Sequence, residues 1–438
     1  MTEAKTKPYE VVHDFRDRAI LVGVDRGQRG WPIEADLAEL ARLVDTAGAE
    51  IVGSVTQRLD RPHPRTFIGA GKAEEVATLA EQTDATLVVF DDDLTPSQQA
   101  NIENLVLGVK ILDRTALILD IFALHAKSRE GRLQVELAQM EYLLPRLRGL
   151  WRHFGQAAAA SGGALGIGTR GPGETQLETD RRLARRRIQE VRRELKAVAA
   201  ARDTQRSSRH RSGVFRVALV GYTNAGKSTL LNALTGADAL VQDKLFATLD
   251  ATTRRLELPE GRIVTLTDTV GFINKLPHSL VEAFKSTLDE VREADLLLHV
   301  IDTSHPMAKA QMAAVSEVLG ELDVAATPQL LVYNKVDLVE QAELGQLHRI
   351  SPGAVFVSGV HHTGLDELLD KIASEAAHGD RTLDVLIPYT RGDLVRLAHE
   401  DARIISEEHL EDGTHLIVRV PTAYADAFGE FEGEEEPG

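Results

Sequence analysis

The feature that most constrains the fold is a glycine-bounded octapeptide between an apolar run and a helix-forming run. It reads Gly221-Tyr222-Thr223-Asn224-Ala225-Gly226-Lys227-Ser228, after Val217-Ala218-Leu219-Val220 and before Thr229-Leu230-Leu231-Asn232. This strand–loop–helix order is the context that a phosphate-binding loop requires. Its glycines allow backbone N–H groups to turn toward phosphate oxygens at the positive end of a helix. We expect Lys227 to contact the β- and γ-phosphates and Ser228 to ligate Mg²⁺. The alternative is an ordinary glycine-rich turn.

A second motif, Asn334-Lys335-Val336-Asp337, follows the apolar run Leu330-Leu331-Val332-Tyr333. It therefore falls at the carboxyl end of a strand, where open α/β sheets bind nucleotides. The Asp337 carboxylate can accept hydrogen bonds from guanine N1–H and the 2-amino group, whereas adenine offers neither. The Lys335 stem would lie along the base. Alone, this motif is often a helix start, because Asn and Asp cap helices. After a phosphate loop, it predicts GTP rather than ATP.

Three further segments complete the predicted nucleotide site. Thr267-Asp268-Thr269-Val270-Gly271 follows a strand, so Asp268 can hold Mg²⁺ through water and the Gly271 N–H can approach the γ-phosphate. In Phe246-Ala247-Thr248-Leu249-Asp250, Thr248 is the predicted second Mg²⁺ hydroxyl, with Thr252 and Thr253 as competitors. Ser358-Gly359-Val360 is expected to support guanine O6 through backbone N–H groups. The predicted catalytic set is Lys227, Thr248, Asp268 and Gly271, and the predicted metal ligands are Ser228 and Thr248.

Phe272 stands directly after the Asp268–Gly271 segment. Many GTP-hydrolysing proteins place a glutamine there to orient the attacking water, which phenylalanine cannot do. Hydrolysis is then either slow or assisted by a cation or a partner. Asn224 offers one route, since its side-chain oxygen could help K⁺ bridge the β- and γ-phosphates. The other interpretation is that Asn224 only tolerates a left-handed backbone.

Length and composition narrow the protein class. A chain of 438 residues can form two to four domains, and no apolar run approaches the twenty residues of a membrane span. The first ten residues are charged rather than signal-like, and there is no cysteine. We therefore expect a cytoplasmic protein without disulfides or thiol-bound metal. We also expect it to act as a monomer. The formal net charge of −17 argues against nucleic-acid binding over the whole surface.

One local surface is nevertheless basic. Residues 177–212 carry twelve Lys or Arg against five acids, with apolar positions spaced like a heptad seam from Leu177 to Val198. A matching seam runs from Leu133 to Leu147, with Pro145 expected to kink or end that helix. Two such helices predict an antiparallel arm. The arginines could be merely a solvated face, but their density favours a phosphate-rich partner.

The remaining segments give the domain order. Residues 161–173 contain six glycines and form either a plain linker or an arm-tip loop that a partner orders. Alternating strand and helix patterns before the arm predict a small parallel sheet. Phe67–Lys72 there lacks the spacing and the hydroxyl of a second phosphate loop. We predict an N-terminal α/β domain at 1–112, the helical arm at 113–212, a P-loop GTPase domain at 213–378, a small α+β domain at 379–427 and an acidic disordered tail at 428–438.

Several blocks together resemble the HflX family, the ribosome-associated GTPases of the Obg–HflX superfamily. The most distinctive are Gly173-Glu174-Thr175-Gln176 and Phe246-Ala247-Thr248-Leu249-Asp250, and the similarity covers nearly the whole chain. The resemblance implies that the N-terminal unit and arm bind the large ribosomal subunit and its rRNA, with the tip loop aimed at the peptidyl-transferase region. It implies a GTPase switch that splits or rescues stalled or idle ribosomes. Small departures are Ala251 for the usual proline and Gly359 for the usual alanine.

A second hypothesis is a signalling or ribosome-assembly GTPase that acts through a protein partner or a membrane surface. No cysteine is available for C-terminal lipidation, and the basic arm is large, so we favour the ribosomal hypothesis and expect no membrane partner.

Overall fold

The computed structural model describes residues 16–27, 31–147, 176–210, 214–236, 244–275, 277, 285–324, 326–378 and 380–432. The predicted tip loop at 161–173 lies outside these residues. The chain forms two compact units, one made of residues 1–121 with 145–165 and the other of residues 122–144 with 166–438. The predicted boundary at 112/113 cuts the strand Lys110–Asp113, and the first unit continues into the next helix as far as Ile121.

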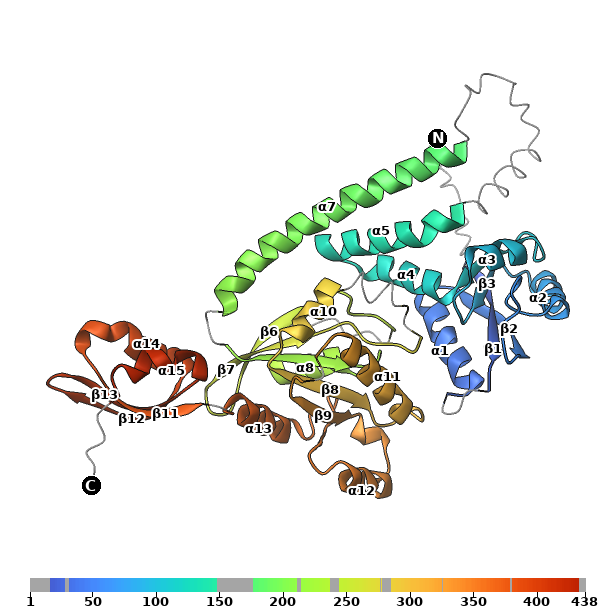
Figure 1. The fold of residues 1–438 in the computed structure, drawn as a ribbon. Coiled ribbons are helices and arrows are strands. Elements are labelled where there is room, and N and C mark those ends of the chain that lie inside the picture. Colours follow the sequence, from blue (N-terminus) through green and yellow to red (C-terminus); the bar gives the residue numbers. More distant parts are fainter. Residues whose placement is uncertain are drawn as a thin grey trace, which may run out of the picture. The chain divides into compact units, whose positions relative to one another are not determined.

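The first unit is a small α/β sheet domain, as predicted. Four parallel strands lie in the order β2-β1-β3-β4 (Figure 1). The β3 segment Leu-Val-Val-Phe is buried throughout, as expected of a strand covered on both faces. Its elements are β1 (Arg18–Asp25), α1 (Ile33–Thr46), β2 (Glu50–Arg58), α2 (Ala70–Gln82), β3 (Leu87–Phe90), α3 (Pro96–Glu103), β4 (Lys110–Asp113) and the part of α4 (Arg114–His125) that precedes Phe122.

The second unit begins with the helical arm. Helix α5 (Arg129–Leu143) packs against the 35-residue helix α7 (Gln176–His210). Arg129 pairs with Glu194, and Glu136 further along α5 pairs with Arg187, so the helices run in opposite directions (Figure 1). Pro145 lies in a short 3-10 turn directly after α5, which ends that helix as expected.

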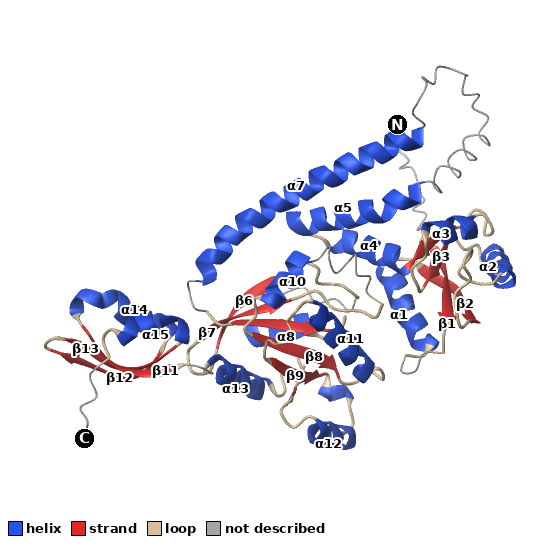
Figure 2. Ribbon diagram, in the orientation of Figure 1, coloured by secondary structure: helices blue, strands red, loops and turns tan. Residues whose placement is uncertain are grey.

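The centre of the second unit is a six-stranded sheet in the order β10-β9-β8-β5-β7-β6. Figure 2 labels its strands β6, β7, β8 and β9. Only the edge strand β6 is antiparallel to its neighbour among these pairs. Its elements are β5 (Arg216–Gly221), α8 (Lys227–Thr235), β6 (Thr252–Glu257), β7 (Ile263–Asp268), α10 (Lys285–Arg292), β8 (Leu296–Asp302), α11 (Ala308–Glu321), β9 (Gln329–Asn334), α12 (Gln341–Ile350), β10 (Val355–Phe356) and α13 (Leu365–Ala376).

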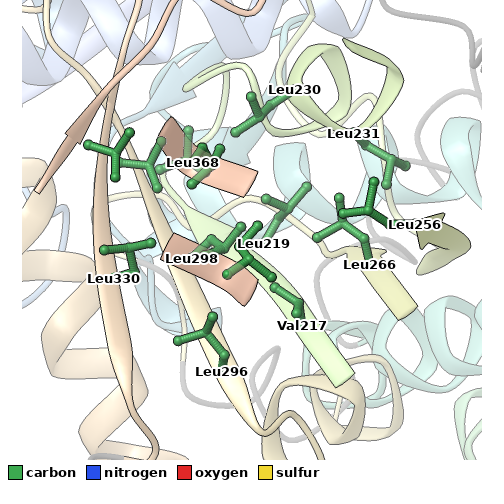
Figure 3. Packing of buried hydrophobic residues seen from close by; sticks show 14 of the residues in the cluster. Val217, Leu219, Leu230, Leu231, Leu256, Leu266, Leu296, Leu298, Leu330 and Leu368 are labelled. Atoms are coloured by element: carbon green, nitrogen blue, oxygen red, sulfur yellow. The ribbon is translucent and has the colours of Figure 1, made fainter. Parts of the chain in front are cut away.

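The hydrophobic core beside this sheet includes residues of strands β5, β7 and β8. Leu219 of β5, Leu266 of β7 and Leu298 of β8 are fully buried and pack with Leu230 of α8 and Leu368 of α13 (Figure 3). Burying an aliphatic side chain of this size contributes about 1.5–3 kcal/mol. The packed core therefore fixes the carboxyl ends of three adjacent parallel strands, of which β5 and β7 carry predicted nucleotide motifs.

A small α+β module follows. Its antiparallel sheet has the order β11-β13-β12, and its elements are β11 (Arg381–Ile387), α14 (Gly392–Asp401), β12 (Arg403–Leu410), β13 (Gly413–Val420) and α15 (Thr422–Gly429). The predicted tail boundary at 427/428 cuts α15. Phe428 is fully buried in the core of the module, because α15 packs on β11. Residues 428–432 therefore belong to the module, and 433–438 lie outside the described residues. Across the described part of the chain, no helix is both long and apolar enough to cross a membrane.

Candidate nucleotide and magnesium site

The predicted phosphate loop connects β5 to α8. Gly226 has φ +92°, and a Cβ there would collide with the side-chain nitrogen of Asn334. Gly221 has φ +152°, and a Cβ there would collide with the carbonyl of Val300. Both positions therefore require glycine for space as well as for backbone conformation. The loop is thus held against two neighbouring strands, with the N-terminus of α8 at its end.

Lys227 is the first residue of α8 and is only 6% exposed. Its Nζ donates to the carbonyl oxygens of Gly221 at 3.2 Å and Tyr222 at 2.9 Å, so the side chain curls back over the loop. Burial lowers the pKa of Lys227 to about 8, although the nearby carboxylate of Asp268 opposes that shift. A phosphate oxygen at this position would stabilise the ammonium group.

Three predicted magnesium-side oxygens converge at the end of β7. The Ser228 hydroxyl lies 2.6 Å from Asp268 Oδ2 and 2.9 Å from the Thr248 hydroxyl, and the latter donates to the same carboxylate oxygen at 3.0 Å. Mg²⁺ prefers such oxygen donors and shares its coordination with phosphates and water. The set therefore fits the metal. Burial raises the pKa of Asp268, and the charge of Lys227 opposes this.

The two competitors of Thr248 lie elsewhere. Thr252 is the first residue of β6, and the Thr253 hydroxyl pairs with that of Thr267 at 3.0 Å across the β6–β7 ladder. The structure therefore brings Thr248, and neither competitor, to Ser228.

A cavity opens over the phosphate loop. It includes most of the predicted phosphate-side residues. The predicted residues that do not line it are Gly221, Tyr222, Ala225, Leu249, Asp250, Asp268 and Val270. The lining residues are Thr223, Asn224, Gly226, Lys227, Ser228, Thr229, Lys244, Phe246, Ala247, Thr248, Thr269 and Gly271. A Cβ on Gly271 would lie 2.8 Å from Thr223 Cα and 3.0 Å from Lys227 Nζ, so the close packing of this residue on the phosphate loop requires glycine. The approach of its N–H to the γ-phosphate stays a prediction.

Asn334 joins the guanine motif to two other loops. Its Nδ2 donates to the Ala225 carbonyl at 2.9 Å, and its Oδ1 accepts the Gly359 N–H at 3.1 Å. Lys335 has φ +64°, and its Nζ pairs with Asp302 Oδ2 at 2.6 Å. Asp302 ends β8 opposite Asn334 and thereby orients the lysine stem.

Asp337 lies in the short 3-10 turn Val336–Leu338, with His361 Nε2 3.8 Å from its carboxylate. Nearby, the Ser358 N–H is bonded to Thr363 O, and that of Gly359 to Asn334. Of the three N–H groups predicted to support guanine O6, Val360 is therefore the remaining candidate.

Phe272 cannot position water, as predicted. Its side chain is 1% exposed, and its backbone pairs with Gly221 and Thr223 beside the phosphate loop. Asn224 has φ +60°, so it adopts the left-handed backbone that one of its two interpretations proposed. Its role toward K⁺ stays a prediction.

The comparisons with known proteins agree with this geometry. Residues 34–123 match the family described as GTP-binding GTPase N-terminal, residues 125–209 match GTP-binding GTPase Middle Region, and residues 216–335 match 50S ribosome-binding GTPase. A GTPase HflX of Caldanaerobacter subterraneus is 49% identical over 405 residues, covering 92% of this chain and 91% of that protein. The chain belongs to the HflX family of GTPases. A GTPase HflX of Escherichia coli is 43% identical over 389 residues, covering 88% of this chain and 90% of that protein.

Membership in the HflX family makes this chain a GTP-binding, GTP-hydrolysing enzyme. Three residues of its site were missed by sequence reasoning. Lys244 and Thr229 line the phosphate cavity, and Asp302 orients Lys335. Asp302 had a detectable signal, because it ends the buried apolar strand that pairs with the guanine-motif strand. Lys244 had none, since an isolated lysine before a loop has no distinctive spacing.

Proposed function

We propose that this protein is a Mg²⁺-dependent GTP switch that binds the large ribosomal subunit through its helical arm and splits or rescues stalled or idle ribosomes. We propose that it acts as a monomer in the cytoplasm. Its central domain matches a family described as ribosome-binding, and its relatives are HflX GTPases. The observation that carries the proposal is the exposed basic face of α7.

That face is distinct from the seam of the arm. Ile188 and Val191 of α7 are buried, whereas Arg185, Arg186 and Arg193 are exposed. Other arginines have a structural role, because Arg187 makes a bidentate pair with Glu136 at 2.6 and 2.9 Å. The exposed arginines are available to phosphates, and such contacts supply much of the affinity of a protein for nucleic acid.

Cosedimentation with purified large subunits in a non-hydrolysable GTP analogue tests the proposal directly. We expect binding with the analogue and weaker binding with GDP, together with GTP hydrolysis stimulated by the subunits. Absence of the protein from the subunit fraction in both nucleotide states would refute the ribosomal role and favour a protein partner.

Charge removal on the arm tests the basic face. Arg185, Arg186 and Arg193 are replaced together by glutamine. We expect the slope of the logarithm of the binding constant against the logarithm of the salt concentration to become shallower by about two to three. Basal GTP hydrolysis should persist. Arg254 and Arg255 lie exposed on β6 and provide a control that removes two charges, against three on the arm, when both are changed to glutamine. Equal binding by the arm variant and the control would exclude the arm as the RNA contact.

We also propose that K⁺ assists hydrolysis at Asn224, since Phe272 cannot orient water. Turnover in KCl should exceed turnover in NaCl at equal ionic strength, and Asn224→Ser should remove the difference. Equal wild-type rates in the two salts would exclude this cation role.

A further inference from the structure

Asp250, at the end of the loop that carries Thr248, caps a helix of the arm. Its Oδ2 accepts the N–H of Lys127 at 2.9 Å and that of Ser128 at 2.7 Å, and the Ser128 hydroxyl donates to Oδ1. Ser128 is the N-cap of α5, and its hydroxyl also accepts the Gly131 N–H at 2.8 Å. The carboxylate therefore lies at the positive end of α5, where a negative charge is favourable.

Gly131 leaves the space for this contact. A Cβ at that position would lie 2.5 Å from Asp250 Oδ1 and 3.0 Å from Ser128 Oγ. Gly131 is buried in the first turn of α5, where alanine would favour the helix by about 1 kcal/mol. The missing side chain thus weakens α5 slightly and admits the carboxylate.

The loop Phe246–Asp250 also packs against the protein at its first residue, Phe246. Phe246 packs edge-to-face on Phe122, which belongs to the same compact unit, with ring centroids 4.7 Å apart. Thr248 lies midway between Phe246 and Asp250. Two residues span at most about 7 Å, so a displaced Asp250 must displace Thr248 unless the chain between them refolds. Leu249, which lies between Thr248 and Asp250 in the sequence, is only 2% exposed, so its packing restricts movement of this segment.

We propose that Asp250 is a positioning residue for GTP hydrolysis. By binding the N-terminus of α5, it sets the place of the Thr248 hydroxyl beside Ser228 and Asp268. The arm helix is thereby a structural support of the magnesium side of the site. A partner that shifts α5 changes the rate of hydrolysis without touching the nucleotide. This inference rests on the GTPase activity of the family and does not require the ribosomal partner.

The experiment uses the full chain and the variant Gly131→Ala, whose new methyl group displaces the carboxylate from the arm side. Steady-state hydrolysis gives kcat and KM, titration with a fluorescent GDP gives ground-state affinity, and thermal unfolding reports stability. Since misplacement by about 1 Å can cost up to about a hundredfold in rate, we expect kcat to fall about ten- to a hundredfold. GDP affinity and Tm should stay at the wild-type values.

The matched control is Gly345→Ala, which changes a glycine within α12 whose added Cβ meets no atom within 4 Å. It should leave kcat, KM and Tm at or above the wild-type values. A wild-type kcat in Gly131→Ala would overturn the proposal. So would a loss of kcat that merely follows a lowered Tm, because that is the signature of a structural role alone.

A double-mutant cycle separates this route from a direct nucleotide contact by Asp250. If both substitutions break one contact, Asp250→Ala combined with Gly131→Ala should be no slower than Asp250→Ala alone. Asp250→Asn retains one carbonyl oxygen, which can accept from both N–H groups, and should recover part of the kcat lost in Asp250→Ala. Amide exchange near Ser128 should also accelerate in Asp250→Ala. Additive losses, or unchanged exchange, would contradict the proposed link.

Discussion

The side-chain nitrogen of Asn334 donates a hydrogen bond to the carbonyl oxygen of Ala225 at 2.9 Å, across 109 residues of sequence. Because its oxygen also accepts from Gly359, one buried amide holds three loops of the nucleotide site together. Each bond that is lost leaves a buried partner unsatisfied, at about 1–3 kcal/mol. We expect Asn334→Ala to weaken GDP binding about ten- to a hundredfold or more.

A fluorescent-GDP titration measures this loss. Asn104→Ala, which removes only a bond within its own helix turn in the first unit, is the control and should bind normally. Unchanged affinity in Asn334→Ala would mean that the three loops keep their places without the amide.

Asp337 is predicted to select guanine by accepting two hydrogen bonds. Asparagine presents one donor and one acceptor, which mismatches guanine and matches xanthine, whose 2-oxo group is an acceptor. We expect Asp337→Asn to lose GTP affinity by about a hundredfold and to gain affinity for xanthosine triphosphate. Competition titrations with the two nucleotides measure both changes. Asp370→Asn, an exposed carboxylate on α13, should keep the GTP preference.

Thr248 and Thr253 provide a paired test of the magnesium side. We expect Thr248→Ala to lower kcat about a hundredfold, because its hydroxyl meets Ser228 and Asp268. Thr253→Ala should retain wild-type turnover, since its hydroxyl pairs with Thr267 instead. Removing Mg²⁺ with EDTA should stop hydrolysis in the wild type, and added Mg²⁺ should restore it. Equal rates in the two alanine variants would show that the loop rearranges when GTP binds.

His299 makes stability depend on pH. It lies within β8 and is 2% exposed, and burial, aided by the charge of Lys227, lowers its pKa to about 4. Between that value and the ordinary pKa near 6.5, the unfolded chain binds more protons than the folded one. The free energy of unfolding should therefore fall as pH decreases from about 6.5 to 4, by about 3 kcal/mol over the window.

Urea unfolding at pH 7 and pH 5 measures this effect. His299→Gln should flatten the pH dependence, whereas His378→Gln, which changes an exposed histidine after α13, should preserve it. An unchanged slope in His299→Gln would assign the pH dependence to other groups.

Much of the site could be predicted because its chemistry is local. A phosphate loop needs its glycines, lysine and serine within eight residues, and these lie in the strand–loop–helix arrangement that the pattern predicted. The apolar runs before Asp268 and Asn334 placed both residues at the ends of parallel strands. The seam of α7 likewise predicted the buried face that contains Ile188 and Val191.

Other features depend on contacts between distant segments. Thr248 was the preferred candidate, but spacing alone could not exclude Thr252 and Thr253. The packing of the loop brings the Thr248 hydroxyl to Ser228. The extent of the C-terminal module was also misjudged. An acidic, glycine-rich composition predicted disorder from residue 428, but the sheet of the module buries Phe428.

By itself, the sequence determined the family, the GTP chemistry and the order of the sheets and helices, because these depend on residue types at short, regular spacings. Tertiary structure alone decided that Asp250 caps α5, 122 residues before it, and that Asn334 bonds to the phosphate loop. The physical reason is that a carboxylate or an amide has many possible partners along a chain. Only the packed core, by fixing where strands and loops end, selects one of them.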